Sequence, residues 1–190
     1  MGRHQKFLLY GVLLAIVVIG YLAISNNNKR AQTLGGNPTF EEIVGKYTDT
    51  GWQVIDDQMG QLNNDSYEDR LVVLDTDDKK VPNDRMLLVL FGQPNSTYTI
   101  SATSDSAIPC SECGGAMGDP YGGVEIKDKK IIISSSGGSA DRWEIEETYV
   151  FESGRWMLDE RKTTSYNVNQ EPPEPKVEIK TREELGGVTL

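Results

Sequence analysis

The sequence predicts a mainly β domain, built as an antiparallel meander, a small barrel or an open sandwich, behind an N-terminal transmembrane helix and a short second helix. Three observations support this fold class. After Gly51, apolar and polar residues alternate with the period of two that is typical of strands. Turns rich in glycine and other turn-forming residues separate these segments. The connections are too short for crossover helices, so neighbouring strands must be antiparallel.

The N-terminal segment has the strongest signal. Residues 7–24, FLLYGVLLAIVVIGYLAI, carry no charged side chain, and a bilayer core of about 30 Å requires roughly 20 such residues. We therefore expect residues 1–25 to form an uncleaved single-pass anchor in the cytoplasmic membrane. The alternative is a secretory signal peptide cleaved after Ser25, although the apolar part is longer than the usual stretch of about 7–15 residues. Either interpretation places the remaining chain outside that membrane.

A tether and a short helix follow. Residues 26–38 are polar and contain glycine, so we expect a flexible linker. Thr39 is a suitable N-cap for a helix over residues 40–47, FEEIVGKY, because two glutamates lie in its first turn, where the helix dipole favours negative charge. We expect the β domain to cover residues 39–170. The tail, residues 171–190, begins with EPPEP and is expected to dock only partly.

Eight strands are predicted from the alternation. One of them, RMLLVLF at residues 85–91, is apolar on both faces and is expected to be a covered central strand. Asp128 and Lys129 are expected to form a two-residue hairpin turn. The predicted strands are residues 51–56, 70–75, 85–92, 97–102, 123–127, 130–135, 142–152 and 155–166.

The seventh of these strands shows the clearest alternation and predicts one face toward the core and one toward water. The expected core face carries Trp143, Ile145, Tyr149 and Phe151, and the expected wet face carries Arg142, Glu144, Glu146 and Thr148.

Charge and histidine content limit the function. The chain has a net charge of −10, and all 29 acidic residues follow residue 30. Such a body repels phosphate backbones, so we expect no nucleic-acid partner; the membrane, an envelope protein or a small ligand remain as partners. The single histidine, His4, precedes the membrane segment, which excludes histidine-based nucleophilic triads and zinc sites beyond it. We therefore favour a non-catalytic binding or structural module. The alternative is a hydrolase that uses Asp and Glu side chains on cell-envelope glycans.

Cys110 and Cys113 have CxxC spacing. The preferred interpretation is a local disulfide that shapes a glycine-rich loop in an oxidising compartment. A thioredoxin-like redox pair requires a helix N-terminus after the first cysteine, whereas Gly114 and Gly115 follow here. A zinc site requires four soft or nitrogen ligands, and the chain supplies two thiols.

The loop QLNNDSYED, residues 61–69, is a candidate calcium site. Side-chain oxygens at Asn63, Asp65 and Asp69, with the carbonyl of Tyr67, have the spacing that lets a tight loop surround one hard cation. The alternative is a polar turn held by its own hydrogen bonds. The pattern resembles the D-x-[DN]-x-D-G-x-x-D loop of FG-GAP/VCBS-type repeats, which implies a calcium-stabilised β module. It departs from that loop at Gln61, in place of the first aspartate, and at Ser66, in place of glycine.

A wider set of motifs resembles a group of uncharacterised bacterial envelope proteins. These motifs are the loop at 61–69, CxxCGG at 110–115, GDPYGG at 118–123, GGS-x-x-RW at 137–143 and YVF-x-x-G-x-W-x-L at 149–158. The resemblance implies an exported β domain on a lipid or membrane anchor, and it implies no activity. This chain differs in having an apolar span in place of a lipoprotein cysteine.

Overall fold

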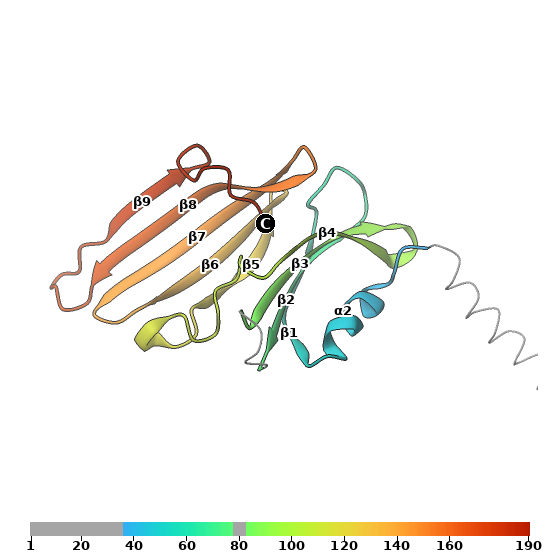
Figure 1. Cartoon of the computed structure of the whole chain (residues 1–190). Helices are drawn as coiled ribbons and strands as arrows, with labels where there is room; N and C mark the ends of the chain where they lie inside the picture. The colour runs from blue at the N-terminus through green and yellow to red at the C-terminus, as the bar shows by residue number, and fades with distance from the viewer. Residues whose placement is uncertain (1–35, 78–82) are drawn as a thin grey trace, which may run out of the picture. The chain divides into compact units, whose positions relative to one another are not determined.

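The computed structural model describes residues 36–77 and 83–190, and within it Pro38–Leu190 form one compact unit (Figure 1). The predicted membrane segment and most of the predicted tether lie outside the described residues. Among the residues that are described, no helix is long and apolar enough to cross a membrane.

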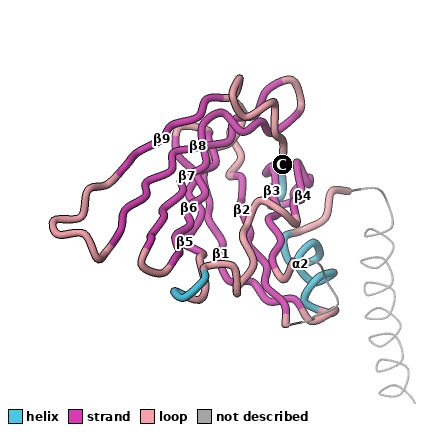
Figure 2. Tube along the Cα trace, turned by 60° about the vertical axis from the view of Figure 1, so that its left-hand side comes forward, coloured by secondary structure: helices cyan, strands magenta, loops and turns pink. Residues whose placement is uncertain are grey.

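Two antiparallel sheets form the unit (Figure 2). In each sheet the strands follow chain order, so each is a meander, and neither closes into a barrel. The predicted antiparallel β class is confirmed, and the barrel alternative is wrong. The first sheet contains β1 (Trp52–Gly60), β2 (Asp69–Thr76), β3 (Arg85–Gln93) and β4 (Thr97–Ser104); the second contains β5 (Tyr121–Lys127), β6 (Lys130–Gly138), β7 (Asp141–Glu152), β8 (Arg155–Asn167) and β9 (Lys176–Thr181). Two short 3-10 helices, η1 (Pro94–Ser96) and η2 (Gly115–Met117), lie in the connections.

The helix α2 (Phe40–Thr48) begins as predicted. The Thr39 hydroxyl accepts a hydrogen bond from the Glu42 backbone N–H at 3.3 Å, and the Glu42 carboxylate accepts one from the Thr39 N–H at 2.9 Å. This capping box satisfies two donors that the helix itself cannot pair. The helix then buries Ile43 and Val44 against one face of the first sheet.

The first sheet is the middle layer, between α2 and the second sheet. Its central strands β2 and β3 are buried on both faces, which confirms the prediction of a covered central strand. The residues that pack with the second sheet are Leu71, Val73, Leu87 and Val89, and those that pack with α2 are Val72, Leu74, Leu88 and Leu90.

An irregularity in β8 decides which of its side chains face the core. Trp156 and Leu158 are buried in the core between the sheets. The β7–β8 register then shifts, because Thr148 pairs with Glu160 and Tyr149 with Leu158, which leaves Asp159 as an extra residue. A bulge of this kind reverses the alternation of side chains along one strand.

Two turns and the tail complete the second sheet. Asp128 and Lys129 have φ values of 51° and 62°, so the predicted two-residue hairpin turn between β5 and β6 is confirmed. The tail, expected to dock partly, contributes β9 at the sheet edge. Beyond β9, the chain returns to the start of β8, where the Leu158 N–H donates to the Val188 carbonyl at 2.9 Å.

Candidate functional site

The loop at 61–69 is closed by a buried carboxylate. Asp69 is fully buried, and its side chain accepts hydrogen bonds from the backbone N–H groups of Leu62 at 2.7 Å, Asn63 at 3.2 Å and Gly92 at 2.9 Å. Burial raises the pKa of Asp69, and the three N–H donors oppose that rise because they favour the charged form. Asp69 therefore fastens the loop to the end of β3.

The other predicted calcium ligands also accept hydrogen bonds from the loop itself. The Asn63 side-chain oxygen accepts from the Asp65 N–H at 2.7 Å, and an Asp65 carboxylate oxygen accepts from the Tyr67 N–H at 2.8 Å. The Tyr67 carbonyl accepts from the side-chain amide of Gln61 at 2.9 Å. Over residues 36–77 and 83–190, no three His, Cys, Asp or Glu side chains are grouped to hold a metal ion. Calcium binding at this loop stays a prediction.

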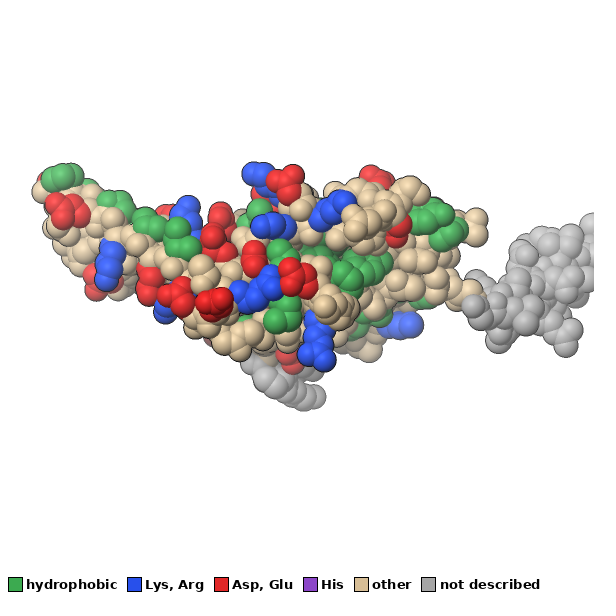
Figure 3. All heavy atoms as spheres, turned by 90° about the horizontal axis from the view of Figure 1, so that it is seen from above, with side chains coloured by type: hydrophobic (Ala, Val, Ile, Leu, Met, Phe, Trp, Pro, Cys, Tyr) green, Lys and Arg blue, Asp and Glu red, His purple; other side chains and the backbone are tan. Residues whose placement is uncertain are grey.

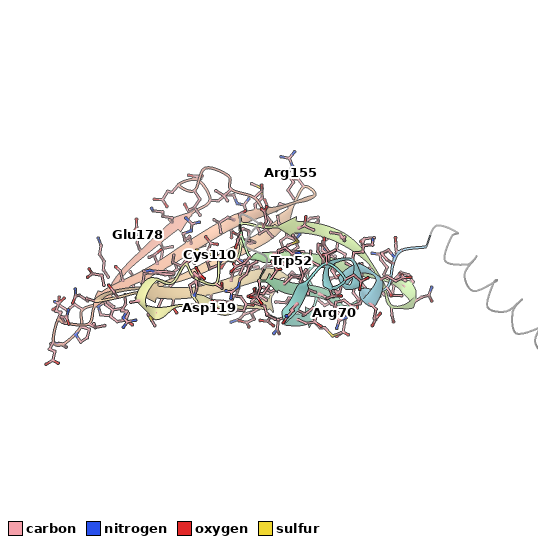
Figure 4. The ribbon with its side chains drawn as sticks, turned by 60° about the horizontal axis from the view of Figure 1, so that its bottom comes forward. Trp52, Arg70, Cys110, Asp119, Arg155 and Glu178 are labelled. Atoms are coloured by element: carbon pink, nitrogen blue, oxygen red, sulfur yellow. A yellow bond between two sulfur atoms is a disulfide. The ribbon has the colours of Figure 1, made fainter. Side chains whose placement is uncertain are left out.

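The two cysteines form the disulfide that the sequence favoured. The Cys110 and Cys113 sulfurs lie 1.98 Å apart, and the loop that they close lies near Asp119 (Figure 4). These are the two cysteines of the chain, so no free thiol remains.

A buried arginine holds this loop to the first sheet. Arg85, at the start of β3, is 2 % exposed and pairs with both carboxylate oxygens of Asp119, with a nitrogen–oxygen distance of 2.6 Å to one of them. Its Nε also donates to Asp75 at 3.1 Å, and its Nη1 donates to the Pro109 carbonyl at 3.4 Å. The bonds from Arg85 lower the pKa of Asp119 although partial burial opposes them. The sequence does not predict this pair; its one signal there is an arginine before an apolar strand.

Several glycines of the wider motifs allow close packing. The Gly138 N–H donates to the Gly114 carbonyl at 2.9 Å, which joins the disulfide loop to the end of β6. A Cβ at Gly137 would lie 2.4 Å from the Trp143 ring, and one at Gly114 would lie 2.2 Å from the Gly118 carbonyl oxygen. The motifs at 110–115, 118–123 and 137–143 therefore meet in one packed junction, and their role there is structural.

A shallow hollow of about 250 Å³ lies on the second sheet, on the face turned away from the core. Small residues on β5 and β6, namely Gly122, Ser134 and Ser136, leave the space, and longer side chains of β7 and β8 border it. The pairing of Ser134 with Glu146 and of Glu146 with Lys162 places these residues in one row across three strands. A second row joins Ser136, Glu144 and Thr164 in the same way.

The polar side chains of this hollow have no partner within the described part of the chain. Ser134, Ser136 and Thr164 offer hydroxyls, Glu144 and Glu146 offer carboxylates, and Lys162 offers an ammonium group. We call these six residues the polar rows. The alternation in the sequence predicts that Glu144 and Glu146 lie on the wet face of their strand. It does not predict the serines, Lys162 or Thr164, which join them only through strand pairing.

A larger hollow of about 460 Å³ lies beside the loop at 61–69. Half of its lining residues lie in connections between strands, whereas every residue that lines the first hollow lies in a strand. A binding site is held more precisely by strands than by loops, so the polar rows are the better candidate.

Comparison with protein-family models, with curated proteins and with solved structures finds no match to this chain. The fold and the hollow define a two-sheet β domain with an open polar sheet face. The two motif resemblances stay predictions.

Proposed function

We propose that this protein is a membrane-anchored extracytoplasmic binding module, without catalytic activity, and that its polar rows bind a cell-envelope glycan. The observation that carries the proposal is the hollow itself. Six polar side chains without protein partners face one open depression, and regular strands hold their backbone in place.

The chemistry of the polar rows fits a polyhydroxylated ligand. Each sugar hydroxyl both donates and accepts hydrogen bonds. Serine and threonine hydroxyls do the same, carboxylates accept, and an ammonium group donates. Hydrogen bonds to charged groups contribute about 1.5–3 kcal/mol each, and several on one ligand give specificity. Nucleic acids and other polyphosphates fit poorly, because the domain is strongly acidic.

The proposed location rests on two features of the chain. The apolar segment at residues 7–24 is long enough to span a bilayer. The Cys110–Cys113 disulfide is typical of proteins that function in oxidising compartments outside the cytoplasm.

Calorimetric titration of the full-length protein with soluble peptidoglycan fragments tests the proposal. We expect saturable binding that Glu144→Gln combined with Glu146→Gln weakens at least tenfold. The matched control is Glu125→Gln, because Glu125 is an exposed glutamate of β5 outside the hollow. Absence of binding by the wild type, or equal weakening by the control, contradicts the proposal.

The hydrolase alternative has one supporting observation. Glu144 and Glu146 lie two residues apart on the same face of β7, so two neighbouring carboxylates project from that face. Carboxyl pairs of inverting glycosidases are about 6.5–9.5 Å apart. Both glutamates are exposed on a shallow surface, however, where water is not excluded as it is in a catalytic cleft. Release of reducing sugar during the titration, abolished by either single Gln variant, would favour the hydrolase.

A further inference from the structure

The free edge of β9 differs from the other three sheet edges. β1 has a register shift between Val54 and Asp56, β4 has one at Ser101, and β5 has one at Gly122. Bulges twist an edge and prevent it from pairing with another chain. The pairing of β8 with β9 is regular throughout, so β9 presents a regular ladder of backbone donors and acceptors on its open side.

The side chains of β9 are exposed on both faces. Val177 and Ile179 are each 52 % exposed and lie on the face of the polar rows, because Val177 pairs with Thr164 and Ile179 with Lys162. Lys176, Glu178 and Lys180 alternate on the other face. In Figure 1, β9 lies near the top of the molecule, and Figure 3 views the molecule from above. Acidic, basic and hydrophobic side chains lie close together on the surface seen there.

We propose that the edge of β9 pairs with β9 of a second copy of this chain, antiparallel and centred on Ile179, to form a two-fold symmetric dimer with a continuous ten-stranded sheet. The charge pattern selects this register. A pairing centred on Glu178 places Glu178 against Glu178 and Lys176 against Lys180, so every charged pair repels. A pairing centred on Ile179 places Glu178 of each copy against Lys180 of the other.

The apolar residues agree with the same register. Directly opposite residues in an antiparallel pair point to the same face of the sheet. Ile179 then contacts Ile179 of the second copy, and Val177 contacts Thr181 of the second copy. The polar rows of the two copies lie on one face of the joined sheet, because the two-fold axis is perpendicular to that sheet. Pairing over five residues is short, so the dimer is a weak one.

Cross-linking tests the register directly. Both native cysteines are in the disulfide, so one introduced cysteine is the sole free thiol of the chain. In full-length protein treated with a mild oxidant, we expect Ile179→Cys to form a covalent dimer, because directly opposite Cβ atoms are about 4.5–5.5 Å apart. Val177→Cys is the matched control: it has the same exposure on the same face, but its two copies are about 14 Å apart in this register. Equal cross-linking of the two variants overturns the proposal.

Sedimentation of the full-length protein and its variants, all in the same detergent, gives an independent measurement of self-association. We expect Ile179→Lys to weaken self-association at least tenfold, because it places two ammonium groups face to face on the two-fold axis. Ile100→Lys, on the bulged edge β4 where Ile100 is 47 % exposed, should leave self-association unchanged. A wild-type protein that remains monomeric, or a dimer that Ile179→Lys does not weaken, overturns the proposal.

Discussion

The Asp69 carboxylate accepts a hydrogen bond from the Gly92 backbone N–H at 2.9 Å, across 23 residues of sequence. A Cβ at Gly92 would lie 2.3 Å from the Glu68 carbonyl oxygen, so glycine is what allows the loop to approach the end of β3 this closely. The contact makes Asp69 a structural residue of the fold.

Asp69→Ala is expected to lower the free energy of unfolding by about 3–5 kcal/mol, because it leaves several buried N–H groups without an acceptor. The measurement is urea unfolding of the full-length protein. Asp65→Ala is the control: Asp65 is exposed and accepts one N–H bond, so the expected loss is about 1 kcal/mol. Similar losses for the two variants would contradict the assigned role of Asp69.

The Arg85–Asp119 pair predicts a dependence of stability on pH. Arg85 lowers the pKa of Asp119 below its usual 3.8. The stabilisation is therefore fully present above about pH 4 and is lost as the pH falls through the lower pKa of the folded state. Asp119→Asn should lower the free energy of unfolding by about 1–2 kcal/mol at pH 7. The loss is modest because the Asp119 side chain is half-exposed.

The free energy of unfolding should be measured for wild type and Asp119→Asn over a series of pH values. The difference between the two proteins should be constant from pH 7 to 5 and smaller below pH 4. Asp105→Asn serves as the control, because Asp105 is exposed and its side chain has no described partner. A difference that grows on acidification would contradict the assigned direction.

The calcium prediction is tested by restoring the residues at which the loop departs from the FG-GAP/VCBS-type pattern. Gln61→Asp with Ser66→Gly removes the amide donor on the Tyr67 carbonyl and supplies a further carboxylate. We expect this variant to melt at a higher temperature in calcium than in chelator. Binding to the folded state alone adds about 2.7 kcal/mol at a hundredfold excess over Kd.

Asp65→Ala added to that variant should abolish the calcium effect. A rise of several degrees in the wild type, also abolished by Asp65→Ala, would show that the native loop already binds calcium. No response even in the restored variant would contradict a cation site at residues 61–69.

Two glycines with open surroundings predict opposite effects of alanine. A Cβ at Gly45 or at Gly154 meets no atom within 4 Å. Gly45 lies inside α2, where alanine is favoured by about 0.5–1 kcal/mol. Gly154 has a φ of +79° in the β7–β8 turn, where alanine costs about 1–2 kcal/mol. Thermal unfolding should show Gly45→Ala as stabilised and Gly154→Ala as destabilised; any other order of the two contradicts these conformations.

Reduction of the disulfide should have a small effect. The Cys110–Cys113 bond closes a very short loop, so its removal costs about 2 kcal/mol or less. The contacts from Arg85 to the Pro109 carbonyl and between Ser111 and Asp84 remain. Thiol titration should find no reactive thiol before reduction and two after it. Unfolding of the whole domain on reduction would contradict this account.

The elements that the sequence predicted correctly are those whose signals are local. Alternation placed the strand at β7, and Thr39 with its following glutamates placed the start of α2. The sequence predicts β9 only as part of a partly docked tail, because the proline-rich segment before it obscures a short polar alternation. The Arg85–Asp119 pair joins residues 34 positions apart, and no local pattern encodes such a contact.

The sequence predicts only part of the polar rows, for the same reason. Glu144 and Glu146 share a face by simple alternation, but Ser134, Lys162 and Thr164 meet them through the register of three strands. Register depends on turn geometry and on bulges, neither of which the composition of a strand reveals.

The extra residue in β8 interrupts the alternation of side chains along one strand. Before Asp159 the even-numbered side chains, Trp156 and Leu158, fill the core, and after it the even-numbered side chains, Lys162 and Thr164, line the outer hollow. If Asp159 were paired in an unbroken ladder, continuous alternation from Leu158 would turn Lys162 and Thr164 toward the core. The extra residue therefore lets one strand place Trp156 and Leu158 in the interior and, further along, Lys162 and Thr164 on the outer face.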